Sequence, residues 1–228
     1  MFKNRSYTKE LLDGDHIPKD DLYQNLKELD VINNLLGGYK ITFNALKKVL
    51  SKEKQITLVD IGSGGGDTLK RIHGWNAKQH FDLKLYGIDL KQICIDYSVE
   101  RNSSDIKFIC DDYRNVLKYV PKVDMIHACL FCHHLNEQEI IGLIEFCTQN
   151  KITLIVNDLQ RNPFAYYAIK VLTTLFSKSY LVKNDAPLSV LRGFKKQEWE
   201  DILRQSGAKK YSIKYKWAFR YEVIVYGE

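Results

Sequence analysis

A glycine-rich turn between residues 60 and 67 is the stretch of this chain whose residue types most clearly indicate chemistry. It follows the apolar run 56–60 and holds four glycines within five positions: Gly62, Gly64, Gly65 and Gly66. Glycine lets a ligand lie against the backbone, where a Cβ atom would clash. Residues 68–72 have a helical pattern, and the start of a helix presents free N–H groups. The stretch therefore predicts the front of a nucleotide-binding α/β unit.

The glycine spacing argues against a dinucleotide. Counted from Gly62, the G-x-G-x-x-G fingerprint requires glycine at position 67, where this chain has Asp67. A carboxylate is unfavourable beside a pyrophosphate and favourable beside a ligand that carries positive charge.

A second acid is placed to bind a ribose. Asp89 ends an apolar run and lies 89 − 66 = 23 residues after Gly66, where the tip of the second strand of such a unit meets a ribose. A carboxylate can accept hydrogen bonds from both ribose hydroxyls. The alternative is an ordinary solvated aspartate at a strand end.

The pattern Asp60-x-Gly62-x-Gly64-x-Gly66, together with Asp89, resembles motif I of class I S-adenosylmethionine-dependent methyltransferases. The resemblance covers roughly residues 57–227. It implies that S-adenosylmethionine is the cofactor, that no metal is bound, and that Asp111, or alternatively Asp112, accepts a hydrogen bond from the adenine amino group. The implied cofactor-binding residues are Asp60, Gly62, Ser63, Gly64, Gly66, Asp89, Leu90, Asp111, Asp112, Tyr113 and Cys129.

Apolar runs predict the elements that position these residues. The fold class is α/β, a Rossmann-like doubly wound sheet, with parallel strands expected at 56–60, 83–89, 106–111, 123–130 and 152–158. Segments 211–219 and 221–226 flank a very short turn and predict an antiparallel hairpin. The resemblance implies the strand order 3-2-1-4-5-7-6.

Two helical regions lie outside the predicted sheet. Residues 1–51 are expected to form an N-terminal helical lid, with one helix from Pro18 to about Leu36 and a second ending near Leu50. We expect the same region to pack against the sheet edge, since the two roles do not exclude each other. Residues 52–228 form the expected methyltransferase domain, and residues 161–194 form a helical insertion over the site.

Several residues after the fourth and fifth strands are candidates for catalysis. His133 and His134 are predicted to remove a proton from a phenol or enol, or else to be scaffold. Arg161 is predicted to supply a cation, with binding of backbone carbonyls as the alternative. The segment after strand four lacks the Asn/Asp-Pro-Pro-aromatic motif of enzymes that methylate base amines. A predicted apolar roof, or alternatively simple core packing, comprises Phe164, Tyr166, Tyr167, Leu172 and Phe176.

Composition limits the remaining possibilities. The chain has 228 residues and a net charge of +6, which allows peripheral contact with a membrane surface. Five cysteines in apolar segments predict reduced thiols in a cytoplasmic protein, and the pair Cys129 and Cys132 alone does not predict a metal or redox site. We expect no signal peptide, no transmembrane segment and no nucleic-acid partner. A monomer and a homodimer both remain open.

Together these patterns predict a methyltransferase that acts on a small, hydrophobic aromatic or phenolic acceptor, with methylation on oxygen. The closer resemblance is to bacterial methyltransferases of phenolic polyketides, phenolic lipids or quinone precursors. One alternative is a catalytically silent S-adenosylmethionine-binding protein of the same fold. The other is a nucleic-acid methyltransferase, which only the net positive charge favours.

Overall fold

Seven strands form one sheet at the centre of the molecule. They are β1 (Ile56–Ile61), β2 (Leu83–Asp89), β3 (Ile106–Cys110), β4 (Met125–Cys129), β5 (Thr153–Leu159), β6 (Tyr211–Lys216) and β7 (Arg220–Val225). The computed structural model describes residues 1–14 and 16–227. The strand order is β3-β2-β1-β4-β5-β7-β6, as predicted. β1 to β5 are parallel, and β7 is antiparallel to β5 and β6, so the predicted fold class is confirmed.

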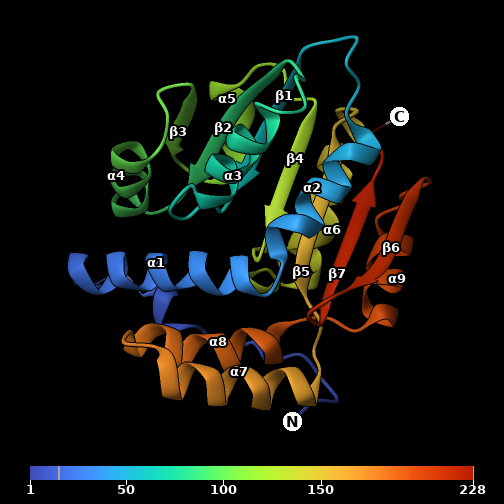
Figure 1. Cartoon of the computed structure of the whole chain (residues 1–228). Coiled ribbons are helices and arrows are strands. Elements are labelled where there is room, and N and C mark those ends of the chain that lie inside the picture. Colours follow the sequence, from blue (N-terminus) through green and yellow to red (C-terminus); the bar gives the residue numbers. More distant parts are fainter. Residues whose placement is uncertain (15, 228) are drawn as a thin grey trace.

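Helices cover both faces of this sheet and its carboxyl edge (Figure 1). They are α1 (Lys19–Leu35), α2 (Gly38–Val49), α3 (Asp67–Asn76), α4 (Gln92–Arg101), α5 (Val116–Tyr119), α6 (Glu137–Gln149), α7 (Pro163–Phe176), α8 (Tyr180–Arg192) and α9 (Lys196–Gln205). Short 3-10 turns are η1 (Leu11–Asp13), η2 (Tyr113–Asn115) and η3 (Cys132–His134). Side chains of α2 and α3 pack on one face of the sheet, and those of α5, α6 and α9 on the other.

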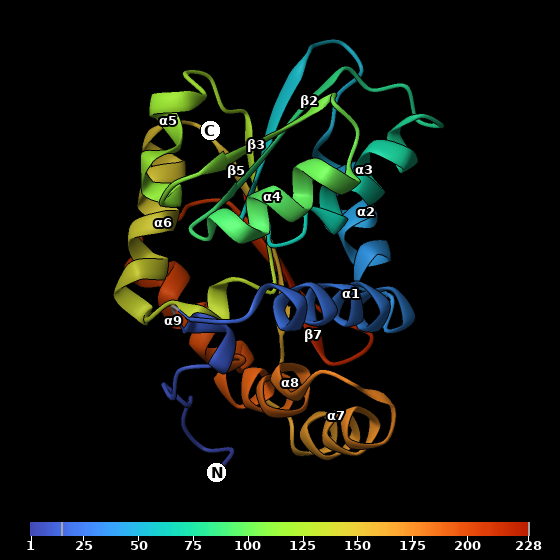
Figure 2. The same ribbon diagram turned by 90° about the vertical axis from the view of Figure 1, so that its left-hand side faces the viewer.

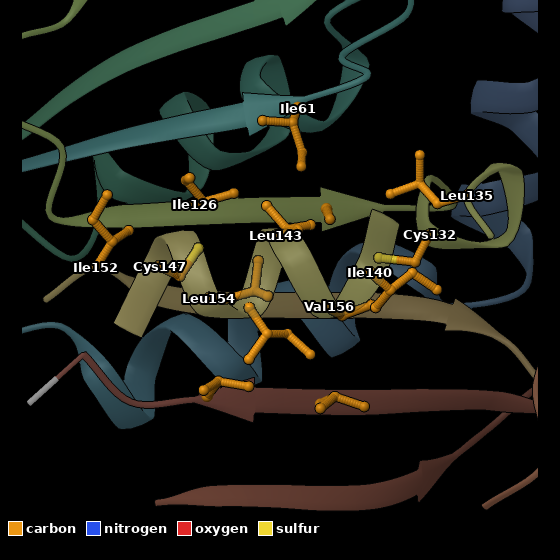
Figure 3. Packing of buried hydrophobic residues seen from close by; sticks show 14 of the residues in the cluster. Ile61, Ile126, Cys132, Leu135, Ile140, Leu143, Cys147, Ile152, Leu154 and Val156 are labelled. Atoms are coloured by element: carbon orange, nitrogen blue, oxygen red, sulfur yellow. The ribbon is translucent and has the colours of Figure 1, made fainter. Parts of the chain in front are cut away.

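The larger apolar core lies between β4, β5 and α6 (Figure 3). Apolar residues of α6 recur at helical spacing, and Ile140, Leu143 and Cys147 are buried against the strands. Asn136 and Glu139 form a capping box that satisfies free N–H groups at the start of this helix. β5 is buried on both faces through most of its length, which its continuous apolar sequence requires. This core fixes the carboxyl ends of β4 and β5, where the site begins.

Three helices lie beyond the carboxyl ends of the parallel strands. Figures 1 and 2 show α1 lying across these strand ends, with α7 and α8 on the far side of α1. Gly37, in the left-handed conformation (φ 72°), separates α1 from α2, where the sequence predicted the break. α7 and α8 lie within residues 161–194, where the sequence predicted a helical insertion.

The predicted bounds of the fourth strand and of the hairpin differ from those in the structure. The fourth strand is Met125–Cys129, shorter than the expected 123–130. β6 ends at Lys216 and β7 begins at Arg220, so the turn between them covers residues 217–219. Phe219 has a positive φ of 56°, which extended backbone cannot adopt, and the chain therefore leaves the sheet before this residue.

Within the described ranges, no helix is both long enough and apolar enough to cross a membrane. All five cysteines are free thiols.

Candidate active site

A cavity of about 630 Å³ opens at the carboxyl ends of β1, β2 and β4, beneath α1, α7 and α8. Its volume lies within the roughly 300–1,000 Å³ of small-molecule sites. One part of its wall comes from the loops that follow the strands, and the other from the helices and the N-terminal segment. Of the cofactor-binding residues predicted from the sequence, those that line the cavity are Gly62, Ser63, Gly64, Asp89, Leu90, Asp111, Asp112, Tyr113 and Cys129.

The glycine turn is shaped by three left-handed residues. Gly62, Gly64 and Gly66 have φ values of 61°, 51° and 73°, a region that other residues adopt at a cost. A Cβ atom at Gly62 would lie 2.2 Å from a ring carbon of Phe131. Glycine is therefore required at this position by the protein's own packing as well as by any ligand.

Asp89 connects the tip of β2 to the glycine turn. One carboxylate oxygen accepts a hydrogen bond from the backbone N–H of Gly64 (2.9 Å), and the other accepts from the N–H of Lys91 (2.9 Å). Each oxygen keeps a second lone pair that can accept from a ribose hydroxyl. Burial raises the pKa of Asp89, and the two backbone hydrogen bonds oppose that rise.

Two of the predicted cofactor-binding residues, Asp60 and Gly66, are not among the described residues that line the cavity. The carboxylate of Asp60 is 2.7 Å from Nδ1 of His127, whose Nε2 is 3.1 Å from the hydroxyl of Thr42. A Cβ atom at Gly66 would come within 2.7 Å of the Phe108 ring. Asp60 and Gly66, which the sequence predicted to bind the cofactor, therefore support the turn through contacts within the protein.

The two acids predicted to meet adenine already have partners. Asp111 accepts from the Asn115 side chain (2.9 Å) and the Tyr119 hydroxyl (2.7 Å), and hydrogen bonds lower its pKa. Asp112 accepts from the backbone and guanidinium of Arg114, and these hydrogen bonds hold its pKa below the usual range. Both line the cavity, so the choice between them stays a prediction.

A pair of acids lies in the cavity wall near the glycine turn, and one of them, Asp30, is also paired with Arg71 at 3.3 Å. Asp30 of α1 and Asp67 at the start of α3 both line the cavity. Burial, and then the charge of Asp30, raise the pKa of Asp67 to about 6. This patch suits a ligand that carries positive charge. Asp30 was not predicted because its position within a helical repeat shows nothing of what it faces.

The predicted histidines stand at another part of the cavity wall, on η3. Nδ1 of His133 lies 2.7 Å from Oδ1 of Asp158, and the backbone N–H of His133 donates to Oδ2 (3.1 Å). Nδ1 of His134 lies 3.0 Å from Oδ1 of Asp13. Burial alone would raise the pKa of Asp158, but the charge of the His133 ring and its hydrogen bonds hold that pKa below its usual range.

Two residues of the N-terminal segment complete this group and were missed from the sequence. Glu10 is buried, and its carboxylate accepts from the hydroxyl of Ser189 (2.8 Å). Burial raises its pKa. Asp13 accepts from Arg192 (3.2 Å) as well as facing His134. These acids precede the first predicted helix and belong to no periodic pattern, so only the tertiary structure brings them to the cavity.

The prediction for Arg161 needs correction. Arg161 is not among the described residues that line the cavity, and its side chain is buried outside the cavity. It donates to the backbone carbonyls of Phe2 (3.1 Å), Lys3 (3.2 Å) and Gly193 (2.6 Å), and pairs with Glu198 (2.6 Å). The guanidinium therefore holds the N-terminal segment and the end of α8 in place, which matches the alternative of carbonyl binding.

The predicted aromatic roof is also only partly correct. Phe164 and Leu172 line the cavity, whereas Tyr166 packs against Phe2 and Phe176 is 78% exposed. Apart from Phe164, the residues of α7 that line the cavity are aliphatic. The apolar wall is completed by Leu26, Leu29, Ile32, Leu36, Ala165, Ala168, Ile169, Val182 and Val190.

Solved methyltransferases share this fold. The plantazolicin methyltransferase BpumL, in complex with SAH, matches with a TM-score of 0.59 at 18% identity, over 91% of this chain and 99% of its own. Human N-acetylserotonin methyltransferase, in complex with SAM, matches with a TM-score of 0.62 at 16% identity. The match covers 92% of this chain and 56% of the human chain. A SAM-dependent methyltransferase from Aquifex aeolicus matches with a TM-score of 0.60 at 17% identity, and the match covers 92% of this chain and 98% of the Aquifex chain.

No protein-family model matches the sequence, and a search of curated proteins finds no match. At identities below one fifth, the structural likeness shows the fold. The chain has the fold of class I S-adenosylmethionine-dependent methyltransferases, as the sequence predicted.

Proposed function

We propose that this chain, built on the class I methyltransferase fold, transfers a methyl group from S-adenosylmethionine to a small hydrophobic acceptor. The observation that carries the proposal is the joined unit of the glycine turn and Asp89, which faces the cavity with free lone pairs. The acidic pair of Asp30 and Asp67 adds a place for the positive charges of this cofactor. Neighbouring folds solved with SAM or SAH support the same cofactor.

The residues of the cavity fit this cofactor in two respects. Ser63 and Asp89 offer side-chain oxygens at the tips of β1 and β2, where ligands of such sheets lie, and Gly64 lets a ligand approach the backbone between them. Leu90 and Phe131 add apolar surface suited to an adenine ring. When bound, S-adenosylmethionine supplies an electrophilic methyl group on a sulfonium.

We assign the acceptor to the part of the cavity between α1, α7 and η3. The wall there is mainly aliphatic, with Leu29, Ile32, Ile169 and Leu172, which favours an apolar molecule. The plantazolicin methyltransferase and the N-acetylserotonin methyltransferase are named for two different acceptors, so these structural likenesses do not identify the acceptor of this chain. An aromatic or phenolic compound methylated on oxygen is the proposed class. Residues 1–51 are proposed to act as a lid, because α1 lies across this space.

Transfer to a hydroxyl requires that its proton leave while the oxygen forms a bond to the methyl carbon. A free phenol has a pKa of about 10 and is mostly protonated near neutral pH. His133 and His134 line the cavity and are oriented by Asp158 and Asp13. Since these carboxylates hold the Nδ1 atoms, the Nε2 atoms remain to assist loss of the proton. We propose that His133 and His134 assist the loss of the acceptor's proton.

Titration of the protein with S-adenosylhomocysteine, followed by mass spectrometry of reactions with a series of phenols, tests the proposal. We expect binding, and a methyl ether as product. Replacing both histidines, His133→Gln with His134→Gln, should lower turnover most for the least acidic phenols and leave cofactor binding unchanged. His73→Gln, a surface histidine on α3, is the matched control.

The alternatives give distinct outcomes in the same experiment. Binding without turnover of any acceptor would indicate a catalytically silent binding protein. Absence of cofactor binding would reject the proposed function itself. Methylation of hydrophilic amines alone would overturn the phenol assignment and keep the cofactor assignment.

A further inference from the structure

Three side chains at the acceptor end of the cavity direct donor atoms to one point. Nε2 of His133 lies 3.6 Å from Oε1 of Glu10, and Nε2 of His134 lies 3.8 Å from Oε2. The ligand atoms that these residues offer all lie within 4.8 Å of one another. Both nitrogen–oxygen distances exceed a hydrogen bond, so these contacts do not satisfy the two nitrogens. All three residues line the cavity.

The opposite side of each imidazole is held by a carboxylate. Asp158 faces Nδ1 of His133 at 2.7 Å, and Asp13 faces Nδ1 of His134 at 3.0 Å. Because an ionised carboxylate can only accept, each Nδ1 carries a proton. In a neutral ring this leaves a lone pair on Nε2, and both lone pairs belong to nitrogens beside Glu10. Histidines that bind metals show this same carboxylate contact on their other nitrogen.

We propose that Glu10, His133 and His134 form a site for a divalent transition metal ion, with imidazole and carboxylate ligands that suit Zn²⁺ or Fe²⁺. Metal bonds of about 2.0–2.1 Å at tetrahedral angles separate ligand atoms by roughly 3.3–3.4 Å. The two nitrogen–oxygen separations of 3.6 and 3.8 Å need to shorten by about 0.2–0.5 Å, and the remaining separation, which lies within 4.8 Å, needs to shorten by up to about 1.5 Å. Three protein ligands leave a further position open toward the cavity.

Charge favours a metal over two protonated rings. The rings of His133 and His134 lie 4.3 Å apart between centroids, so two imidazolium cations there would repel each other. With neutral rings, the surrounding carboxylates of Glu10, Asp13, Asp158 and Asp185 outnumber the guanidinium groups of Arg5 and Arg192 by 4 − 2 = 2. A dication balances this difference.

The proposed site rests on the proposed function for its role and deepens it. With an ion bound, both Nε2 atoms would coordinate it and would assist proton loss through the ion, not as free bases. An acceptor hydroxyl at the open position would then lose its proton to solvent more readily, because the ion stabilises the oxygen anion. The oxygen then forms the bond to the methyl carbon, and the carbon–sulfur electron pair stays on sulfur. This proposal differs from the expectation of a metal-free site, which was made from the sequence, where Glu10 could not be placed.

Metal binding is measured without any methyl acceptor or cofactor. Chelator-treated full-length protein is titrated with Zn²⁺ by calorimetry, and with Co²⁺ by its visible absorption. We expect one equivalent to bind, and Glu10→Gln or His134→Gln to weaken binding by about 100-fold or more. Asp158→Asn should weaken it by about 10–100-fold, because it orients His133 without binding the ion. His73→Gln should bind as the wild type does.

Circular dichroism and thermal melting show whether each variant folds, and His134→Gln serves if Glu10→Gln does not, since His134 is the more exposed residue. No binding by folded wild-type protein would overturn the metal site. One equivalent that still binds to both the Glu10→Gln and the His134→Gln variants would also overturn it. Metal binding that is lost in the ligand variants, in a protein that never binds S-adenosylhomocysteine, would support the site and reject the proposed function.

Discussion

The backbone N–H of Gly64 donates a hydrogen bond to the carboxylate of Asp89 at 2.9 Å. This contact ties the turn after β1 to the tip of the neighbouring strand β2. The hydroxyl of Ser98 on α4 donates to the carbonyl of Gly64 at 2.9 Å, so both polar groups of this glycine are held. The cofactor side of the cavity is therefore organised by the chain itself, before any ligand binds.

Asp89→Ala should reduce the affinity for S-adenosylhomocysteine far more than Asp67→Ala. Loss of Asp89 removes hydrogen bonds from ribose hydroxyls to a charged acceptor, each worth about 1.5–3 kcal/mol, and also releases Gly64. Asp67 begins α3 and lies near the start of a helix dipole worth typically 0.3–1 kcal/mol. Calorimetric titration measures both, with Asp96→Ala on the exposed face of α4 as control. Equal losses for Asp89 and Asp67 would contradict the assignment.

Gly62→Ala should destabilise the protein and weaken cofactor binding. The substitution forces a side chain into a left-handed backbone and places Cβ 2.2 Å from Phe131. Overpacking of this kind costs about 1–3 kcal/mol. Gly142→Ala is the matched control, because this glycine lies inside α6 with nothing within 4 Å of the added Cβ. There we expect a gain of roughly 0.5–1 kcal/mol from helix propensity. Urea unfolding measures both, and an unaffected Gly62→Ala would show that the turn can readjust.

Local sequence signals predicted the parts of the structure in which one segment determines its own conformation. The glycines at 62, 64 and 66, the apolar strand cores and the break at Gly37 all follow from local preferences. The strand order came from the resemblance, since pairing partners far apart in the chain leave no local pattern.

The remaining parts depend on contacts between distant segments. Glu10 meets His133 because tertiary contacts hold the N-terminal segment there, among them the hydrogen bond from Arg192 to the carbonyl of Thr8 (2.9 Å). Arg161 looked catalytic because it follows β5 closely, yet its guanidinium turns to the carbonyls of Phe2 and Gly193. A side chain's direction is set by its neighbours in space, which the sequence alone does not show.

Arg161→Ala should therefore act on stability. It leaves three backbone carbonyls and the Glu198 carboxylate without this donor, and breaking a buried ion pair costs roughly 3–5 kcal/mol. Because Glu198 is partly exposed, we expect a loss of about 2–4 kcal/mol in the free energy of unfolding. Arg204→Ala removes an exposed ion pair with Asp201 and should cost about 0–1 kcal/mol. If Arg161→Ala lowered turnover and left the unfolding curve unchanged, a role at the site would be restored.

Asp67 gives a prediction with a definite dependence on pH. Its pKa is raised in the folded protein to about 6, above the ordinary value of 3.8, mainly by burial. A raised pKa means that the folded state holds the proton more tightly, so this contribution to stability is present below about pH 4 and is lost as the pH rises through about 6. Asp67→Asn keeps the shape and removes the charge. It should raise the melting temperature of the cofactor-free protein more at pH 8 than at pH 5.

The size of this gain follows from the shift. About two pKa units correspond to about 3 kcal/mol, and partial exposure of Asp67 reduces the expected gain at pH 8 to about 1–2 kcal/mol. The same substitution should weaken S-adenosylhomocysteine binding at pH 8, because the ammonium of that ligand loses a carboxylate partner, and should weaken it less at pH 5. Asp96→Asn on the exposed face of α4 is the control for a general change in net charge. An equal gain in melting temperature at both pH values would show that ionisation of the Asp67 carboxylate does not destabilise the folded protein. Unchanged ligand binding at pH 8 would show that the ligand's positive charge lies elsewhere in the cavity.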